Sequence, residues 1–187
     1  MTVNNKVSFT QMIDGTREDY DLVFAHEEQS IKQQAGKVIT WLQMMSGDSP
    51  YRISRLDHCL QTATRAETEG ASDEMIACAL LHDIGDVLAP ANHSEVAAAL
   101  LRPYVSDQSY QIVRHHGLFQ GYYWMHHFDQ DPRVRDRYSD QPWYEACVEF
   151  CARWDQASFD PHYRTHSLEH FIPLIEWLFA RPRSEYV

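Results

Sequence analysis

The sequence predicts an all-α protein, a compact bundle of about six to seven helices. Apolar residues recur at helical spacing through most of the 187 residues. Residues that commonly cap helices precede many of these segments, and Gly or Pro often follows them. No segment shows the convincing alternation of apolar and polar residues that indicates a half-buried strand.

Boundary signals define each predicted helix. Thr16 followed by Asp19 resembles a capping box, Ser72, Ser106 and Ser167 are further N-cap candidates, and Pro142 suits a first helical turn. The stretch 117–141 is aromatic and interrupted by Gly and Pro, which predicts partly irregular structure. The predicted helices cover, in order, about 16–45, 53–69, 72–85, 92–103, 106–116, 142–157 and the segment from 167 onward.

Composition limits the possible classes of function. The length predicts a single domain over residues 1–187. A formal net charge of −11 argues against nucleic-acid binding, which requires many cations. No apolar run is long enough for a membrane span, and no signal peptide is visible, so we expect a cytoplasmic protein. The four Cys are then expected to be reduced core thiols; the oligomeric state is left open.

Histidine and aspartate residues occur in the order H…HD…H…H…D on successive predicted helices. A helical bundle can build a metal site in its core from such positions. Each imidazole ligates one metal, whereas a carboxylate can bridge two, so an adjacent His-Asp pair suits a site for two metals. No Lys or Arg stands beside Asp83 in the sequence to neutralise it. The candidate ligands are His58, His82, Asp83, His93, His115 or His116, and Asp155. Four His and two Asp suit Fe or Mn, or Zn, better than Ca or Mg.

This order over residues 58–155 resembles the HD-domain superfamily, named for its His-Asp pair. Many HD proteins are metal-dependent phosphohydrolases, and the simplest have only H…HD…D around one metal. The additional His93 and His116 resemble the dinuclear branch, which includes myo-inositol oxygenase, the oxygenase that cleaves 2-amino-1-hydroxyethylphosphonate, and its relative acting on the trimethylammonium analogue.

The resemblance implies an HD-domain helical bundle with a mixed-valent Fe(II)/Fe(III) pair that uses O2 to cleave a C–P or C–C bond of a small hydroxylated substrate. It favours His116 over His115 as the ligand, because Val-Arg precedes it at the spacing of the phosphonate enzymes. The implied metal ligands are His58, His82, Asp83, His93, His116 and Asp155. The alternative is a metal-dependent phosphohydrolase with Mn or another divalent metal, and a binding or regulatory module is a third possibility.

Several positions depart from the phosphonate enzymes or are candidates for contacting substrate. Gln120 stands where those enzymes have a Lys, and Asp86 stands where HD enzymes often have a cation or His. Asp86 is predicted to act beside Asp83 in catalysis and to favour an ammonium or polyhydroxylated substrate, unless it caps a turn or pairs with an Arg such as Arg153. The further substrate-binding candidates are Tyr51, Tyr123 and Arg153, and Arg52, Arg55 and Arg164 are other possible phosphate-binding cations.

Overall fold

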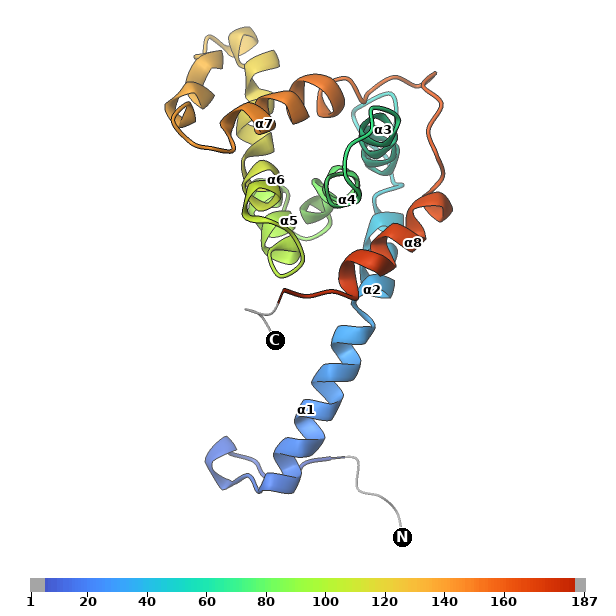
Figure 1. Cartoon of the computed structure of the whole chain (residues 1–187), viewed down its shortest axis with the longest axis vertical. Helices are drawn as coiled ribbons and strands as arrows, with labels where there is room; N and C mark the ends of the chain where they lie inside the picture. The colour runs from blue at the N-terminus through green and yellow to red at the C-terminus, as the bar shows by residue number, and fades with distance from the viewer. Residues whose placement is uncertain (1–5, 184–187) are drawn as a thin grey trace.

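The computed structural model describes residues 6–183, and all regular secondary structure in that range is helical (Figure 1). This confirms the predicted all-α class. No helix of the described range has the length and apolar character needed to cross a membrane. The α-helices are α1 Arg17–Lys32, α2 Gln34–Met44, α3 Arg55–Thr68, α4 Asp73–Leu81, α5 His93–Leu101, α6 Asp107–Gln120, α7 Tyr144–Phe150 and α8 Leu168–Phe179.

The first predicted helix is in fact two helices, α1 and α2, which are separated at Gln33. The capping box at Thr16 is confirmed, since the Thr16 and Asp19 side chains each accept a hydrogen bond from the other's backbone N–H. In Figure 1, α1 projects away from the other helices. Its Phe24 side chain is 62% exposed, so the apolar pattern of α1 does not contribute to the core as that of α2 does.

Two helix ends differ from the predicted boundaries. The helix α6 continues to Gln120, four residues beyond the predicted end at His116. The α-helical part of the segment predicted from Pro142 runs only from Tyr144 to Phe150. A π-helical turn, Cys151–Asp155, follows it, and the Gln156 N–H donates to the Cys151 carbonyl in the wider i→i+5 pattern. Between α6 and α7 lie 3-10 turns at Gly121–Tyr123, Met125–Phe128 and Pro132–Tyr138.

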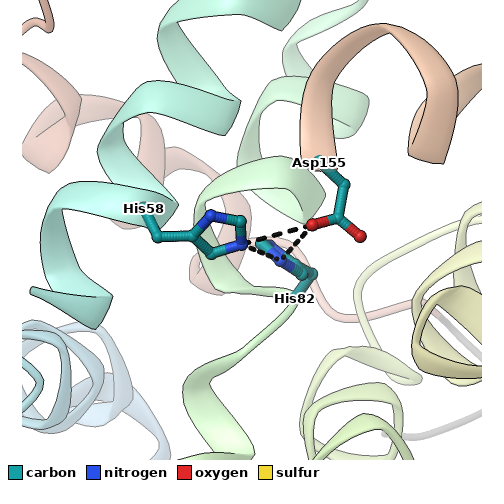
Figure 2. Close-up of side chains that lie close together, drawn as sticks. All are labelled: His58, His82 and Asp155. Atoms are coloured by element: carbon teal, nitrogen blue, oxygen red, sulfur yellow. Dashed lines mark hydrogen bonds and ion pairs between the residues drawn. The ribbon is translucent and has the colours of Figure 1, made fainter. Parts of the chain in front are cut away.

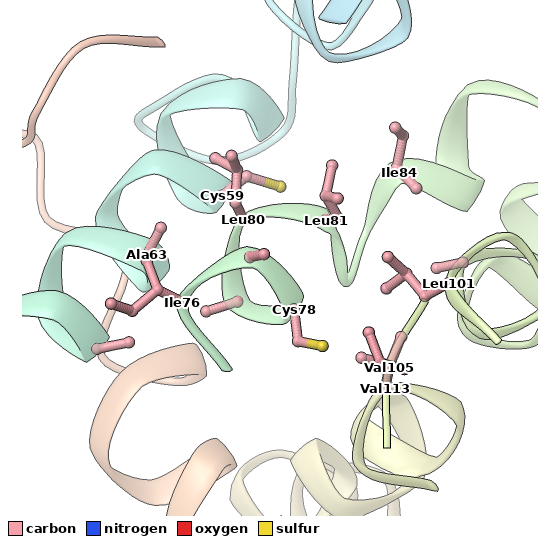
Figure 3. Packing of buried hydrophobic residues seen from close by; sticks show 14 of the residues in the cluster. Cys59, Ala63, Ile76, Cys78, Leu80, Leu81, Ile84, Leu101, Val105 and Val113 are labelled. Atoms are coloured by element: carbon pink, nitrogen blue, oxygen red, sulfur yellow. The ribbon is translucent and has the colours of Figure 1, made fainter. Parts of the chain in front are cut away.

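The central helix of the bundle is α4, which packs against α3, α6 and α8. Its residues from Ile76 to Leu81 are all buried, as expected for a helix that is apolar on every side (Figure 3). The prediction of reduced core thiols is confirmed, because all four cysteines are buried and free: Cys59, Cys78, Cys147 and Cys151.

A close backbone approach joins the end of α4 to the start of α5. After α4 the chain forms a 3-10 turn, Ile84–Val87, that packs against α5. A Cβ atom on Gly85 would lie 2.1 Å from the carbonyl oxygen of His93, a distance that no side chain tolerates. Gly85 is therefore required for the position of His93, the first residue of α5.

We predict that Gly85→Ala destabilises the protein by about 1–3 kcal/mol, because the new methyl group collides with the His93 backbone. Gly36→Ala is the matched control, since no atom lies within 4 Å of its added Cβ and it lies within α2. That change should stabilise by about 0.5–1 kcal/mol. Urea denaturation followed by circular dichroism measures both values, and an equal response of the two variants would contradict the steric explanation.

Candidate metal centre

The structure brings the six predicted ligands together in the core, although they come from separate elements. His58 lies on α3, His82 and Asp83 follow α4, and His116 lies on α6. His93 opens α5, and Asp155 ends the π-helical turn. Five of the residues are buried, and the His93 side chain is 27% exposed. This arrangement places one partly accessible imidazole at the edge of an otherwise enclosed cluster.

One set of ligand atoms is formed by His58, His82 and Asp155 (Figure 2). The Nε2 atom of His58 lies 3.1 Å from Nε2 of His82 and 3.2 Å from Oδ1 of Asp155. The Nε2 atom of His82 lies 3.6 Å from the same carboxylate oxygen. Two imidazole nitrogens and one carboxylate oxygen thus face a common point.

The two oxygens of Asp83 face different histidines. Its Oδ1 lies 3.1 Å from Nε2 of His116 and 3.3 Å from Nε2 of His93. Its Oδ2 lies 3.6 Å from Nε2 of His58 and 3.7 Å from Nε2 of His82. The carboxylate therefore lies between two pairs of imidazoles, which is the position that a bridging ligand occupies.

Backbone carbonyls fix the orientation of all four imidazoles. A carbonyl oxygen only accepts hydrogen bonds, so each Nδ1 carries the proton and each Nε2 presents its lone pair. The Nδ1 donors and their carbonyl acceptors are His58 to Ser158 at 2.9 Å, His82 to Ala79 at 2.8 Å, His93 to Pro90 at 3.3 Å and His116 to Val113 at 2.6 Å. This is the usual second contact of metal-ligating histidines.

The resulting cluster fits metal cations. Two lone pairs that face each other across 3.1 Å, at His58 and His82, cannot hydrogen-bond, whereas a cation near them is coordinated by both. The Oδ2 atom of Asp155 is buried and has no hydrogen-bond partner among the described residues, so it is also available as a ligand. The first ligand set is thus His58, His82 and Asp155, and the second is His93 and His116 together with Asp83. The first set and part of the second have free electron pairs that point to a common position.

The charges of the cluster agree with cation binding. Burial by itself would raise the pKa of Asp83, but His82, His116 and His58 together lower it well below its usual value. Burial is likewise outweighed at Asp155, whose pKa is lowered by the neighbouring His58 and His82. Both carboxylates are therefore anionic at neutral pH and supply two negative charges in the core.

A small cavity of about 100 Å³ opens on this cluster. Tyr51 and Gln120, both predicted to contact substrate, line it, and the Gln120 side-chain amide donates to Oδ1 of Asp155 at 2.7 Å. Tyr123 and Arg153 do not line it. Tyr123 packs beside the hydrophobic core, and Arg153 pairs with Glu69 at 2.6 Å on the surface. Arg153 is thus not the arginine partner of Asp86.

The partner of Asp86 is Arg55, so the alternative in which Asp86 pairs with an arginine is the one found, although the arginine is not Arg153. Arg55 also lies near Asp83, so the expectation that Asp83 has no neighbouring cation is wrong. The Arg55 guanidinium forms an ion pair with Asp86, and its Nη1 lies 3.6 Å from Oδ2 of Asp83. Burial and the neighbouring Asp83 nevertheless raise the pKa of Asp86, against the opposite effect of His93 and Arg55. Arg55 stands three residues before His58, and this spacing places both on one face of α3.

Ser158 and Phe159 also belong to the site, although no motif in the sequence predicts it. The ring of Phe159 stacks on the His58 imidazole, with centroids 4.4 Å apart, and it lines the cavity. The Ser158 carbonyl accepts the Nδ1 proton of His58. In both contacts the two residues are separated by 100 or more positions in the sequence, so no local sequence pattern predicts them.

His116, and not its neighbour, points into the cluster. Nδ1 of His115 is bonded to the carbonyl of Gln111, and its ring stacks on Trp143 at 4.4 Å. Neighbouring helical residues point about 100° apart, so only one of the two side chains can face Asp83.

We predict that Asp83→Ala loses the metal of the buried centre, because both ligand sets depend on this carboxylate. Asp73→Ala, at the exposed start of α4, is the control and should keep the wild-type content. Plasma mass spectrometry of the dialysed proteins gives the number of ions per chain. Full occupancy in Asp83→Ala would refute the bridging position.

The paired histidines give a second prediction. His116→Ala should lose at least one metal ion per chain, whereas His115→Ala should retain its metal but lower the melting temperature, since it removes the stacking on Trp143. Metal analysis and a thermal melt on the same samples separate the two effects. Metal loss in His115→Ala but not in His116→Ala would show that His115, and not His116, is the ligand.

Comparison with known proteins identifies the family. The model of the HD domain matches residues 55–156, which include all six candidate ligands. A search of curated proteins finds no match to this chain. HD domains bind divalent metals, in agreement with the His and Asp clusters described above. The chain belongs to the HD-domain family.

Proposed function

We propose that this protein is a di-iron, O2-dependent oxygenase that cleaves a C–P or C–C bond of a small hydroxylated substrate. The observation that supports this most directly is the position of Asp83, whose two oxygens face separate pairs of histidines. Together with Asp155, these residues provide four imidazoles and two carboxylates for two ions. Such ligands suit iron, and they also accept Mn and other divalent metals.

The bound iron pair would supply O2 activation and the Lewis acidity that lowers the pKa of a substrate hydroxyl. The protein's own residues hold and shield the reactants. The cavity borders His58, Asp83 and His93, so a substrate in it lies beside both ligand sets. The rings of Tyr51 and Phe159, 4.8 Å apart, form an aromatic wall that limits access of water. The Gln120 amide orients Asp155 through its hydrogen bond.

The size and charge of the cavity favour a small substrate. A volume of about 100 Å³ beside the candidate ligands holds only a few heavy atoms of a substrate. Arg55 lies between this cavity and a neighbouring one of about 320 Å³ that Asp86 also lines, so a cation and a carboxylate lie together beside the site. An ammonium-bearing hydroxyphosphonate carries the two complementary charges, and its anionic end can bind the guanidinium directly. Asp86 then acts through this pair and its contact with His93, not as an unpaired carboxylate.

Hydrolysis of a phosphoester is the second candidate function. Arg55 supports it, because a guanidinium next to metal ligands is also suited to binding a phosphate. In that reaction a metal-activated water would attack the phosphorus, and O2 would not be consumed.

Metal analysis and oxygen uptake distinguish the two reactions. For the oxygenase we expect about two iron ions per chain, an EPR signal of an antiferromagnetically coupled mixed-valent pair, and O2 consumption with hydroxyphosphonates or polyols. Release of phosphate from phosphoesters under anaerobic conditions with Mn, and no substrate-dependent O2 uptake, would instead establish the hydrolase.

Replacement of Arg55 tests how the substrate is bound. Arg55→Gln should raise KM for an anionic substrate by about 10- to 100-fold, as expected for loss of a charge-assisted hydrogen bond. Arg153→Gln is the matched control, because its partner Glu69 lies outside the cavity. Arg55→Gln leaves the Asp86 carboxylate without its partner, and the double variant Arg55→Gln/Asp86→Asn removes that charge. The double variant should therefore regain the thermal stability lost in Arg55→Gln, whereas its KM should stay raised. An unchanged KM in Arg55→Gln would exclude this contact.

A further inference from the structure

We propose that Glu67, His166 and His170 form a second metal site, on the surface, that binds one zinc ion or a similar divalent transition metal. Both imidazoles face the same carboxylate. The Nε2 atom of His170 lies 2.9 Å from Oε2 of Glu67, and Nε2 of His166 lies 3.4 Å from the same oxygen. The three potential ligand atoms all lie within 4.8 Å of one another.

Surrounding contacts hold the two histidines in place. The imidazoles of His166 and His170 stack with centroids 4.1 Å apart, and the His170 ring meets the buried Phe171 ring edge-on at 4.9 Å. The backbone N–H of His166 donates to the Thr64 hydroxyl at 3.1 Å, and that hydroxyl donates to the Leu60 carbonyl of α3. The ligands are thus already ordered before a cation binds, which reduces the entropic cost of binding.

The donor set indicates the class of metal. Two imidazoles and one carboxylate are the ligands of many zinc sites that leave a fourth position to water. The side chains of His166, His170 and Glu67 are 48%, 43% and 36% exposed, so solvent can complete the coordination. These residues share no ligand with the buried centre, whose two ligand groups contain other histidines. The surface cluster is therefore a separate site that the oxygenase reaction does not require.

The proposed site lies at one end of a series of contacts that begins at the buried centre. The segment 158–170 runs beside α3 and contacts every third residue of that helix from His58 to Glu67. The paired positions are Ser158 with His58, Asp160 with Gln61, His166 with Thr64, and His166 and His170 with Glu67. A metal ion at Glu67 would restrict the motion of this segment at its C-terminal end. The N-terminal end of the same segment contains Phe159, which stacks on His58.

Zinc binding to the iron-loaded protein tests the site. In equilibrium dialysis against ZnCl2, with iron and zinc counted in the same samples, the wild type should bind one more zinc ion per chain than His166→Ala/His170→Ala. Glu67→Gln should weaken this zinc by roughly tenfold or more. The control is His126→Ala/His127→Ala, another exposed pair, whose ring centroids lie 4.0 Å apart and which belongs to no three-ligand group of the described chain.

Hydrogen exchange tests the proposed effect on the segment. Zinc should slow amide exchange over residues 158–166 in the wild type but not in the double histidine variant. Equal zinc binding by the wild type and that variant, or loss of the ion in the control, would overturn the site. Zinc binding without a change in exchange would overturn its action on the segment. Neither result depends on whether the buried centre catalyses oxygenation, because the iron count and the surface zinc are measured separately.

Discussion

The burial of two carboxylates among four imidazoles is the constraint on which the rest of this structure depends. Removing such charges from water is costly unless cations or hydrogen bonds compensate them. Here Asp83 and Asp155 are almost fully buried. The surrounding imidazoles, when neutral, keep their proton on Nδ1, which is bonded to a backbone carbonyl, so their Nε2 atoms cannot donate a hydrogen bond to the carboxylates. Metal ions would satisfy the carboxylates and the imidazoles at once, in agreement with the divalent metals that HD domains bind.

The helices supply this cluster mainly where their regular structure begins or ends. His82 and Asp83 follow the last turn of α4, His93 opens α5, and Asp155 closes a π-helical turn. Such positions allow side chains from several directions to meet, whereas the middle of a helix presents only one face. The cost appears as tight packing at Gly85, where only a hydrogen atom fits against α5.

The segment after Asp155 connects the buried centre with the surface. It contributes the carbonyl of Ser158 and the ring of Phe159 to the environment of His58, and then follows α3 toward Glu67. At the opposite, N-terminal end of α3, Arg55 lines the cavity and forms an ion pair with Asp86. The helix α3 thereby combines metal ligation, the charge of the substrate cavity and the attachment of the C-terminal part of the chain.

The helical class, most helix starts and the set of candidate ligands could be predicted from the sequence. Capping residues and apolar periodicity act between residues close together in the chain, and the H…HD…H…H…D order is visible in the sequence itself. It did not reveal the break at Gln33 or the π-helical turn at Asp155, which no capping or proline signal marks. The pairing of Arg55 with Asp86 and the stacking of Phe159 on His58 appear only in the tertiary structure, which also shows that His116, favoured by the family resemblance, is the histidine that faces Asp83. The physical reason is that these contacts join elements far apart in the chain, whose relative orientation is set by packing of the whole core around α4.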